Sequence, residues 1–417
     1  MLSLVASLTG WIFVAPLAAL VPKRRDWIAV FGRADGRFLD NAKYFFLQAG
    51  QIESNLRIVF VTGQESVRSA IIAGAREAMR YPSWRAVWYL ARCGTLVVDE
   101  AAWFRRMRFF LLIRARVIQL WHGFGFKWGE VEKWKRESGK VTWASKPLLF
   151  RARLLVYRVT GRLTHYAAVA TTSKFTRDHV YAGMFLASQF PVTGYPRNDF
   201  ARSLEGENRE LAWSNVDAGI KSKLPTWGPL HRKLVLIAPT FRDSGSMPMQ
   251  LDASILRIVD DFAEAQGVEF IFKFHPSEHN VDHIGGRHFH VCARDSDIYP
   301  VMPHLAALVT DYSSMSMDFL LVDKPLLFLI PEDDSYVRND RRLQFDPRTM
   351  MPGPVVPSWR ALLAALASEW KHDGFVAERA ALRRKAFDDL PQAEAVPKLI
   401  ALMRERGWVR DPASGRR

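Results

Sequence analysis

The chain has 417 residues and a net charge of +15, and 49% of its residues are hydrophobic and 24% charged. This composition is typical of a globular protein and excludes a disordered chain, while the length predicts two domains. The two cysteines, Cys93 and Cys292, are far apart without metal-ligand spacing, so we expect reduced, buried thiols in a cytosolic setting.

The N-terminal segment is apolar: residues 1–22 contain no charged side chain, and a basic run begins at Lys23. A cleavable signal peptide is disfavoured, because its positive charges precede its apolar core. A spanning helix interrupted by Gly10 and Pro16, a helix lying in the membrane interface, and an ordinary packed first helix all fit the pattern. We expect residues 1–26 to associate with a membrane, with the chain after Lys23 on the cytoplasmic side.

Short apolar runs alternate with helix-like stretches along the first half of the chain. The predicted strands are Trp27–Phe31, Arg57–Val61, Thr95–Val98, Val117–Trp121 and Ala167–Thr171. The predicted helices include Asn41–Gln48 and Glu65–Ala78. Continuous apolar strands that alternate with helices are typical of a parallel sheet covered on both faces.

The region at residues 101–162 is strongly basic, with 15 Lys and Arg against 3 Asp and Glu, a net charge of +12. Trp and Phe side chains are interspersed among these charges, an arrangement that suits a membrane interface. A solvated surface and a nucleic-acid-binding surface are the alternatives. No nucleic-acid-binding motif is recognisable, so we expect contact with a membrane and none with nucleic acid.

The second half repeats the alternation after a polar linker at Ser203–Trp227. The predicted strands are Leu234–Ala238, Glu269–Phe274, Phe289–Cys292, Ala306–Thr310 and Pro325–Ile330, and the predicted helices include Leu251–Ala265 and Met315–Val322. The last fifty residues are helical in pattern. We therefore predict two doubly wound, Rossmann-like α/β domains, residues 27–205 and 206–417, that face a cleft.

The first chemically suggestive stretch is the sequence QLWHGFGFK, which ends at Lys127. His122 follows a predicted strand, and Gly123 and Gly125 allow the backbone to approach a ligand closely. A histidine with a pKa near neutrality can take a proton from a hydroxyl group. Taken alone, a hydrogen-bonded structural histidine explains His122 equally well.

The second stretch is FKFHP, where His275 lies just beyond a predicted strand and near Lys273. A cationic or donor histidine at this place can hold a phosphate. His279 and His283 continue at i+4 spacing, which would suit a metal only if this stretch were a helix.

The third stretch is a buried strand that runs into TDYSS and then into an amphipathic helix. Free N–H groups at the helix start, with the hydroxyls of Ser313 and Ser314, predict an anion site suited to a pyrophosphate. Simple N-capping by either serine is the alternative, and both roles can hold together.

Two further strand-to-loop junctions carry an Arg and an Asp. The sequence GYPRND supplies Arg197 and Asp199, and the sequence APTFRD supplies Thr240 and Arg242. Each of these two junctions could be a turn that contains an ion pair, or could face the cleft between the two predicted domains.

The chain contains, in this order, the motifs WHG-x-x-x-K, GYPRND, APTFRD, K-x-HP and TDYSS, and D-F and KPLLF follow the last of them. This ordered set resembles the signature of the CDP-glycerol glycerophosphotransferase family. These enzymes are teichoic-acid-type polyol-phosphate transferases and related capsule enzymes. The early FGR-x-x-G…DNAKY and the late FDP…PGP are similar too, so the resemblance covers about residues 27–370. One departure is Phe124–Phe126, where the family more often has Thr-Pro-Leu, and it bears on acceptor contacts.

The resemblance implies a GT-B fold with an N-terminal acceptor domain and a C-terminal donor domain. It implies transfer of glycerol phosphate or ribitol phosphate from a CDP-activated donor to a hydroxyl of a lipid-linked or polymeric acceptor, with release of CMP. The enzyme would act in teichoic-acid-like or capsule polymer synthesis at the cytoplasmic face of the cell membrane. Another GT-B enzyme, a nucleotide-sugar glycosyltransferase or epimerase, is the alternative.

The resemblance also implies roles for individual residues. His122 is the expected general base, and His275 is expected to stabilise charge on the pyrophosphate. The expected donor-side residues are Thr240, Arg242, Lys273, Asp311, Ser313 and Ser314, and the expected acceptor-side residues are Gly123, Lys127, Arg197 and Asp199. Because fixed cations can replace a metal in phosphoryl transfer, we expect no cofactor and no tightly bound metal.

Overall fold

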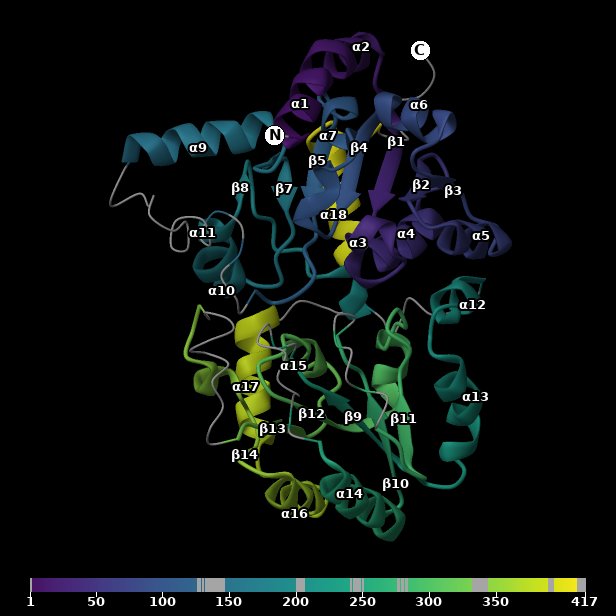
Figure 1. The fold of residues 1–417 in the computed structure, drawn as a ribbon, viewed down its shortest axis with the longest axis vertical. Coiled ribbons are helices and arrows are strands. Elements are labelled where there is room, and N and C mark those ends of the chain that lie inside the picture. Colours follow the sequence, from purple (N-terminus) through teal and green to yellow (C-terminus); the bar gives the residue numbers. More distant parts are fainter. Residues whose placement is uncertain are drawn as a thin grey trace. The chain divides into compact units, whose positions relative to one another are not determined.

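The computed structural model describes residues 2–125, 129, 131, 147–199, 207–240, 242, 249, 251–275, 278, 281, 284–331, 344–388 and 394–410 (Figure 1). The chain divides into two compact units. Unit 1 consists of Met1–His122, Trp128–Ser214 and Asp389–Arg417, and unit 2 consists of Gly123–Lys127 and Asn215–Asp388.

Unit 1 is built on a six-stranded sheet with the order β3-β2-β1-β4-β5-β7. Its strands are β1 (Arg24–Phe31), β2 (Arg57–Thr62), β3 (Ala78–Arg80), β4 (Cys93–Val98), β5 (Arg116–Gln119) and β7 (Ala168–Val169). All neighbours pair in parallel. Every residue of β4 is buried, as a central parallel strand with both faces covered requires. A separate parallel pair is formed by β6 (His165–Tyr166) and β8 (Leu186–Ala187).

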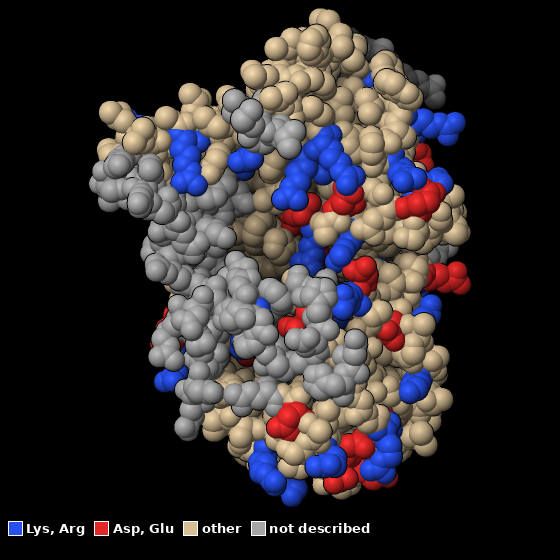
Figure 2. Space-filling model, in the orientation of Figure 1, with Lys and Arg blue, Asp and Glu red and all other residues tan. Residues whose placement is uncertain are grey.

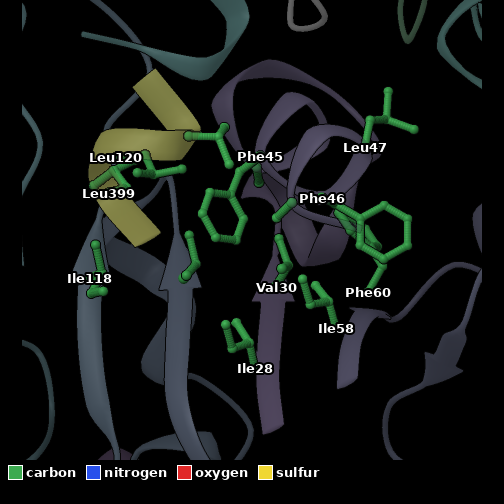
Figure 3. Packing of buried hydrophobic residues seen from close by; sticks show 14 of the residues in the cluster. Ile28, Val30, Phe45, Phe46, Leu47, Ile58, Phe60, Ile118, Leu120 and Leu399 are labelled. Carbon is green, nitrogen blue, oxygen red and sulfur yellow. The ribbon is translucent and has the colours of Figure 1, made fainter. Parts of the chain in front are cut away.

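The core of unit 1 joins helices from opposite ends of the chain. The helices of this unit include α3 (Arg33–Gly36), α4 (Asp40–Ile52), α5 (Glu65–Ala73), α6 (Trp84–Arg92), α10 (Lys174–Thr176), α11 (Ala182–Met184), α12 (Glu207–Trp213) and α18 (Ala395–Glu405). Figure 3 shows Phe45 of α4 and Leu399 of α18 over the strands that carry Val30 and Ile118. The C-terminal helix therefore packs on the first sheet and on α4.

The N-terminal segment folds as α1 (Leu2–Thr9), a π-helical turn η1 (Gly10–Val14) and α2 (Ala15–Leu20). It packs on α7 (Arg108–Leu111). A Cβ atom at Gly10 would lie 2.3 Å from the ring of Phe110, so this close approach requires glycine. Within the described residues, none of the helices has the length and apolar character needed to cross a bilayer.

Unit 2 repeats the plan with the strand order β11-β10-β9-β12-β13-β14, again with parallel neighbours. The strands are β9 (Lys233–Ala238), β10 (Val268–Phe272), β11 (Phe289–Val291), β12 (Leu305–Thr310), β13 (Leu326–Leu329) and β14 (Val355–Val356). The helices are α13 (Ala218–Trp227), α14 (Ala253–Gln266), α15 (Met315–Phe319), α16 (Trp359–Glu369) and α17 (Val376–Phe387). Residues of α14 and α16 bury their apolar faces against β9, β10 and β13.

The predicted α/β class with two parallel sheets is confirmed. The predicted helix Glu65–Ala78 was too long, because α5 ends at Ala73. Gly74 caps the helix and Ala75 takes a φ of 55°, so the chain turns and Ala78–Arg80 joins the edge of the sheet as β3.

Candidate functional site

The first group of candidate residues follows the carboxyl ends of β1, β4 and β5. These strands are neighbours in the sheet of unit 1, so the residues after them share one edge. Arg33 follows β1, Asp99 follows β4, and His122 follows β5 after a short loop. This edge is where open parallel sheets bind ligands.

The imidazole of His122 is held in one orientation. Its Nδ1 lies 2.8 Å from the carbonyl oxygen of Asp99. Because a carbonyl oxygen only accepts, Nδ1 carries the hydrogen, and Nε2 keeps the lone pair that can take a proton. Burial, with the charge of Arg33, lowers the pKa of His122 to about 4. The ring is therefore neutral near pH 7.

Three side chains fix the loop that carries His122. The Gln119 side chain accepts from the backbone N–H of Trp121 at 2.9 Å, and Asn41 donates to the Trp121 carbonyl at 2.8 Å. Arg197 Nη1 donates to the carbonyl of His122 at 2.9 Å. Trp121 has a φ of 55°, and these bonds hold that left-handed conformation.

A buried carboxylate links the start of α4 to Arg197. Asp40 Oδ1 lies 2.8 Å from Arg197 Nη1, and Asp40 Oδ2 lies 3.0 Å from Arg33 Nε. Burial alone would raise the pKa of Asp40, but Arg33, Arg197 and His122 together lower it below its ordinary value. Arg197 is thus a buried cation whose partners are a carboxylate and the His122 loop, which makes it a positioning residue by its contacts.

A second buried carboxyl, Asp99, lies beside this group. Its Oδ2 accepts from the backbone N–H of Ala42 at 3.1 Å. Burial, with the charge of Asp40, raises the pKa of Asp99 well above its ordinary value. Sequence reasoning did not select Asp40, Asn41 or Asp99. The signals were present, since Asp99 directly follows a predicted strand and the other two stand in the DNAKY motif.

Asp199 lies in the same short 3-10 helix as Arg197 (Pro196–Asp199) but has a different partner. Its Oδ2 accepts from the backbone N–H of Ala395 at 3.3 Å, at the start of α18. Asp199 is buried, and this bond ties the GYPRND loop to the C-terminal helix. Its predicted contact with an acceptor stays a prediction.

In unit 2, the carboxyl ends of the neighbouring strands β9 and β12 bring a second group together. Asp311 Oδ1 accepts from the backbone N–H of Thr240 at 2.8 Å, from its hydroxyl at 2.6 Å, and from the N–H of Tyr312 at 2.6 Å. Arg242 Nη2 lies 2.9 Å from Asp311 Oδ2. The Asp311 side chain is fully buried. Its contacts with Thr240, Arg242 and Tyr312 connect the loop after β9 to the loop after β12.

The serines after β12 lie at the start of α15. The Ser313 hydroxyl accepts from the backbone N–H of Met315 at 3.3 Å, whereas Ser314, the N-cap residue of α15, makes no side-chain capping bond. A Cβ atom at Gly123 would lie 2.7 Å from Ser314 Oγ, and both residues belong to unit 2. The glycine of the WHG motif therefore permits a close approach of its backbone to a candidate phosphate ligand.

Lys273 and His275 follow β10. In the sheet, β9 lies between β10 and β12. The Lys273 ammonium donates to the carbonyls of Ala293 and Arg294 at 3.0 and 2.9 Å, so it also holds the loop after β11. His275 is exposed to solvent. Their contacts with a phosphate stay predictions.

Some predicted positions fall outside the described residues, namely Lys127, His279 and His283. Among the residues that the structure describes, no group of three or more His, Cys, Asp or Glu side chains has the geometry of a metal site. Of the predicted site residues, Arg197 thus contacts His122 in unit 1, and Thr240 and Arg242 contact Asp311 in unit 2.

Comparison with known proteins shows one family over most of the chain. The family model of CDP-Glycerol:Poly(glycerophosphate) glycerophosphotransferase matches residues 14–402. The chain is 31% identical over 183 residues to the teichoic acid glycerol-phosphate transferase of Staphylococcus aureus, covering 42% of this chain and 43% of that one. It is 27% identical over 364 residues to the teichoic acid ribitol-phosphate primase of Bacillus spizizenii, covering 86% of each.

The fold resembles a solved structure of the wall teichoic acid polymerase TagF. The TM-score is 0.69 at 16% identity, over 97% of this chain and 96% of that one, which shows a shared GT-B fold. The chain spans 32%, 43% and 25% of the length of three teichoic acid polymerases and transferases that it matches. These relatives are therefore matched over less than half of their own length.

Proposed function

The chain belongs to the CDP-glycerol:poly(glycerophosphate) glycerophosphotransferase family, and from this premise we propose that it transfers glycerol phosphate or ribitol phosphate from a CDP-activated donor. The acceptor is a hydroxyl of a lipid-linked or polymeric chain in teichoic-acid-like or capsule polymer synthesis. The observation that carries this proposal is the family match over residues 14–402. The primase relative, matched over 86% of both chains, supports a polyol-phosphate donor.

In the proposed reaction, the acceptor hydroxyl oxygen attacks the β-phosphorus of the donor. A new phosphodiester bond forms, the bond from that phosphorus to the bridging oxygen breaks, and CMP leaves with the electron pair. The hydroxyl proton goes to His122 Nε2. The neutral imidazole and its fixed tautomer support this role, because the basic nitrogen is the one not bonded to Asp99.

We assign the acceptor side to residues 27–205 and the donor side to residues 206–417, apart from α18, which packs on α4 of unit 1. On the donor side, Arg242 is held rigidly by Asp311, and Ser313 and Ser314 place hydroxyls at the start of α15. Preorganised cations and hydroxyls of this kind stabilise the charge that develops on the bridging oxygen of the donor pyrophosphate as CMP leaves. His275 supplies a further donor from the end of β10.

The proposed enzyme works at a membrane surface. Exposed apolar side chains lie along α1, η1 and α2 and along α9 (Pro147–Val159), including Ile12, Leu17, Leu149 and Leu155. Trp11 Nε1 donates to the carbonyl of Val159 at 2.7 Å, which joins the two segments. The run from α9 through Arg162 has several Arg and no acidic residue, as suits contact with anionic lipid headgroups.

The membrane role is tested with phosphatidylglycerol vesicles and the full chain. We expect Leu149→Asp with Leu155→Asp to lower vesicle binding at least several-fold. The control is Leu230→Asp, at a similarly exposed leucine of unit 2. Equal binding by the double variant and the control would contradict a role for α9 in membrane contact.

The transfer itself is tested by incubation with CDP-glycerol and CDP-ribitol and candidate acceptors. CMP release and the mass of the product are recorded. We expect release from one of these donors, with His122→Ala and His275→Ala each reducing turnover by about 10²-fold or more. Turnover of a nucleotide sugar with none of either CDP-polyol would overturn the proposal in favour of another GT-B enzyme.

A further inference from the structure

A groove in unit 1 lies away from the candidate residues at the carboxyl ends of the strands. It has a volume of about 710 Å³, within the ~300–1,000 Å³ typical of ligand sites. It is lined by parts of α5, β3 and α6, with Trp27 and Arg57 from the amino-terminal halves of β1 and β2. Figure 1 places β3, α5 and α6 at the outer edge of this sheet. The groove is therefore separate from the His122 loop.

The groove is basic. Its lining includes five arginines and two glutamates, a net charge of +3 from the lining residues Arg57, Arg68, Arg76, Arg80, Arg85, Glu65 and Glu77. Arg57 and Arg68 pair with the two glutamates. Arg80 lies 3.9 Å from Glu65, a long contact. Arg85 is exposed and has no acidic partner within 4 Å among the described residues. Figure 2 shows Lys and Arg side chains, interspersed with Asp and Glu, along the edge of the molecule where α5 and α6 lie.

Aromatic rings interleave with these cations. Trp27 stacks on Tyr89 with ring centroids 4.9 Å apart and planes 12° apart. The Arg57 guanidinium lies 4.8 Å from the Trp27 ring, and Arg92 lies 5.5 and 5.4 Å from the rings of Trp27 and Trp88. Trp88 remains 55% exposed. The groove thus presents a flat apolar ring face beside guanidinium groups that still have donors to offer.

We propose that this groove binds a phosphodiester-linked polyol chain, as a holding site for the growing polymer. Arginine forks recognise phosphate oxygens in pairs, and their spread along the groove matches a ligand with repeated negative charges. The exposed face of Trp88 suits the C–H groups of the polyol carbons. The choice of polymer rests on the proposed function, whereas the preference for an anionic chain rests on the groove itself.

The arrangement favours a polyol chain over single-stranded nucleic acid. Nucleic-acid grooves use successive exposed rings on which bases stack. Here Trp27 and Tyr89 stack on each other, and Arg57 and Arg92 lie over the Trp27 ring. Among the described rings that line the groove, Trp88 is the one that is exposed. A ligand without flat bases fits this surface better.

A holding site would raise the effective concentration of the acceptor end of the polymer near the residues proposed to carry out the transfer. Binding at a second point on the same molecule turns the next encounter into an intramolecular one. Long acceptors would therefore benefit from the groove and short acceptors would not. This difference separates the groove from the transfer site in an experiment.

The test uses the full chain and calorimetry without donor. The probe is poly(glycerol phosphate), with a single-stranded oligonucleotide and polyglutamate of equal charge as comparisons. The variants are Arg80→Glu with Arg85→Glu, and Trp88→Ala. Matched controls are Arg257→Glu with Arg360→Glu, on exposed arginines of unit 2, and Trp84→Ala, an exposed tryptophan of α6 that does not line the groove. Thermal unfolding checks that every variant is folded.

We expect each groove variant to weaken binding of the long polymer by about tenfold, with the controls unchanged. Initial CMP release with a short acceptor should stay at the wild-type rate, while KM for a long acceptor rises. Wild-type affinity in both groove variants, or equally tight binding of the oligonucleotide or polyglutamate, would overturn the proposal. Failure of the proposed function would look different, since CMP release would then be absent with every acceptor whatever the polymer binding.

Discussion

Arg197 Nη1 donates a hydrogen bond to the carbonyl oxygen of His122 at 2.9 Å. The same nitrogen lies 2.8 Å from Asp40 Oδ1, so the GYPRND loop, the WHG loop and the start of α4 meet at one guanidinium. A charged donor that is almost fully buried stabilises the carbonyl and prevents the loop from shifting. The arginine of the GYPRND motif therefore has a structural role, which is to hold the His122 loop in place.

Replacing Arg197 should therefore damage stability and transfer together. Arg197→Ala leaves Asp40 as a buried carboxylate with one cation fewer, and removing one partner of a buried pair costs about 3–5 kcal/mol. Arg197→Lys should recover part of the stability but less of the turnover, because an ammonium cannot reproduce the planar fork. Denaturant unfolding and CMP release measure the two effects. The control is Arg177→Ala, which breaks an exposed pair with Asp178 and should leave stability close to that of the wild type.

The two buried carboxyls near His122 should lose different amounts of stability on amide substitution. The pKa of Asp40 is lowered and that of Asp99 is raised well above its ordinary value, so the fold favours the charged form of Asp40 and the protonated form of Asp99. Asp40→Asn should destabilise the protein by about 3 kcal/mol, since Arg33 and Arg197 lose a charged partner. Asp99→Asn should cost about 1 kcal/mol or less, because its amide oxygen can still accept from Ala42. Equal losses in urea unfolding would contradict this assignment.

The lowered pKa of His122 predicts a specific pH dependence. Burial first, then Arg33, bring the pKa to about 4 from an ordinary value of 6.5. Between these values the unfolded chain binds more protons than the folded one, so the free energy of unfolding falls as the pH drops from 6.5 toward 4. His122→Gln should remove up to about 3 kcal/mol of that pH dependence. Unfolding in urea at several pH values measures the difference from the wild type.

The same pKa predicts the acid side of the rate profile. Because His122 is neutral above about pH 4, kcat/KM should be flat between pH 5 and pH 7. A fall of kcat/KM to half its maximum at pH 6.5, continuing about tenfold per pH unit below that with an intact fold, would show that the imidazole titrates normally and would contradict the buried, neutral ring.

Gly123 should not tolerate a side chain. A Cβ atom there would lie 2.7 Å from Ser314 Oγ, so Gly123→Ala must displace the serine or its own loop. We expect a folded protein with CMP release reduced by about tenfold or more, because small misplacements of reacting groups are costly. Adding Ser314→Gly should restore thermal stability to the wild-type range without restoring turnover. Full activity of Gly123→Ala would show that Ser314 has room to move without consequence.

Chelation should leave transfer intact. Arg242 and His275 supply fixed positive charge or donors on the proposed donor side, which is the task that a metal performs in many phosphoryl transfers. CMP release after dialysis against EDTA should equal that of the untreated enzyme. Complete loss of turnover, restored by a divalent cation, would contradict a metal-free mechanism.

Much of the fold could be predicted because its information is local. Strands buried on both faces need continuous apolar runs, and the runs at Trp27–Phe31 and Leu234–Ala238 reveal β1 and β9 without knowledge of their neighbours. Parallel strands place their following loops at one edge, so position after a strand was enough to select His122 and Asp311. The short edge strand β3 was missed because three residues carry no periodic signal.

The α/β class, the two parallel sheets and the order of the motifs could be predicted from the amino-acid sequence alone, because each depends on residues close together in the chain. The partners of Arg197 became known from the three-dimensional structure, since Asp40 and His122 lie 157 and 75 residues away. The structure was also needed to show that α18 packs on α4 and that Arg57, Arg80 and Trp88 line one groove. Such contacts depend on the order of strands in the sheet and on packing between distant segments, which no local pattern of apolar and polar residues encodes.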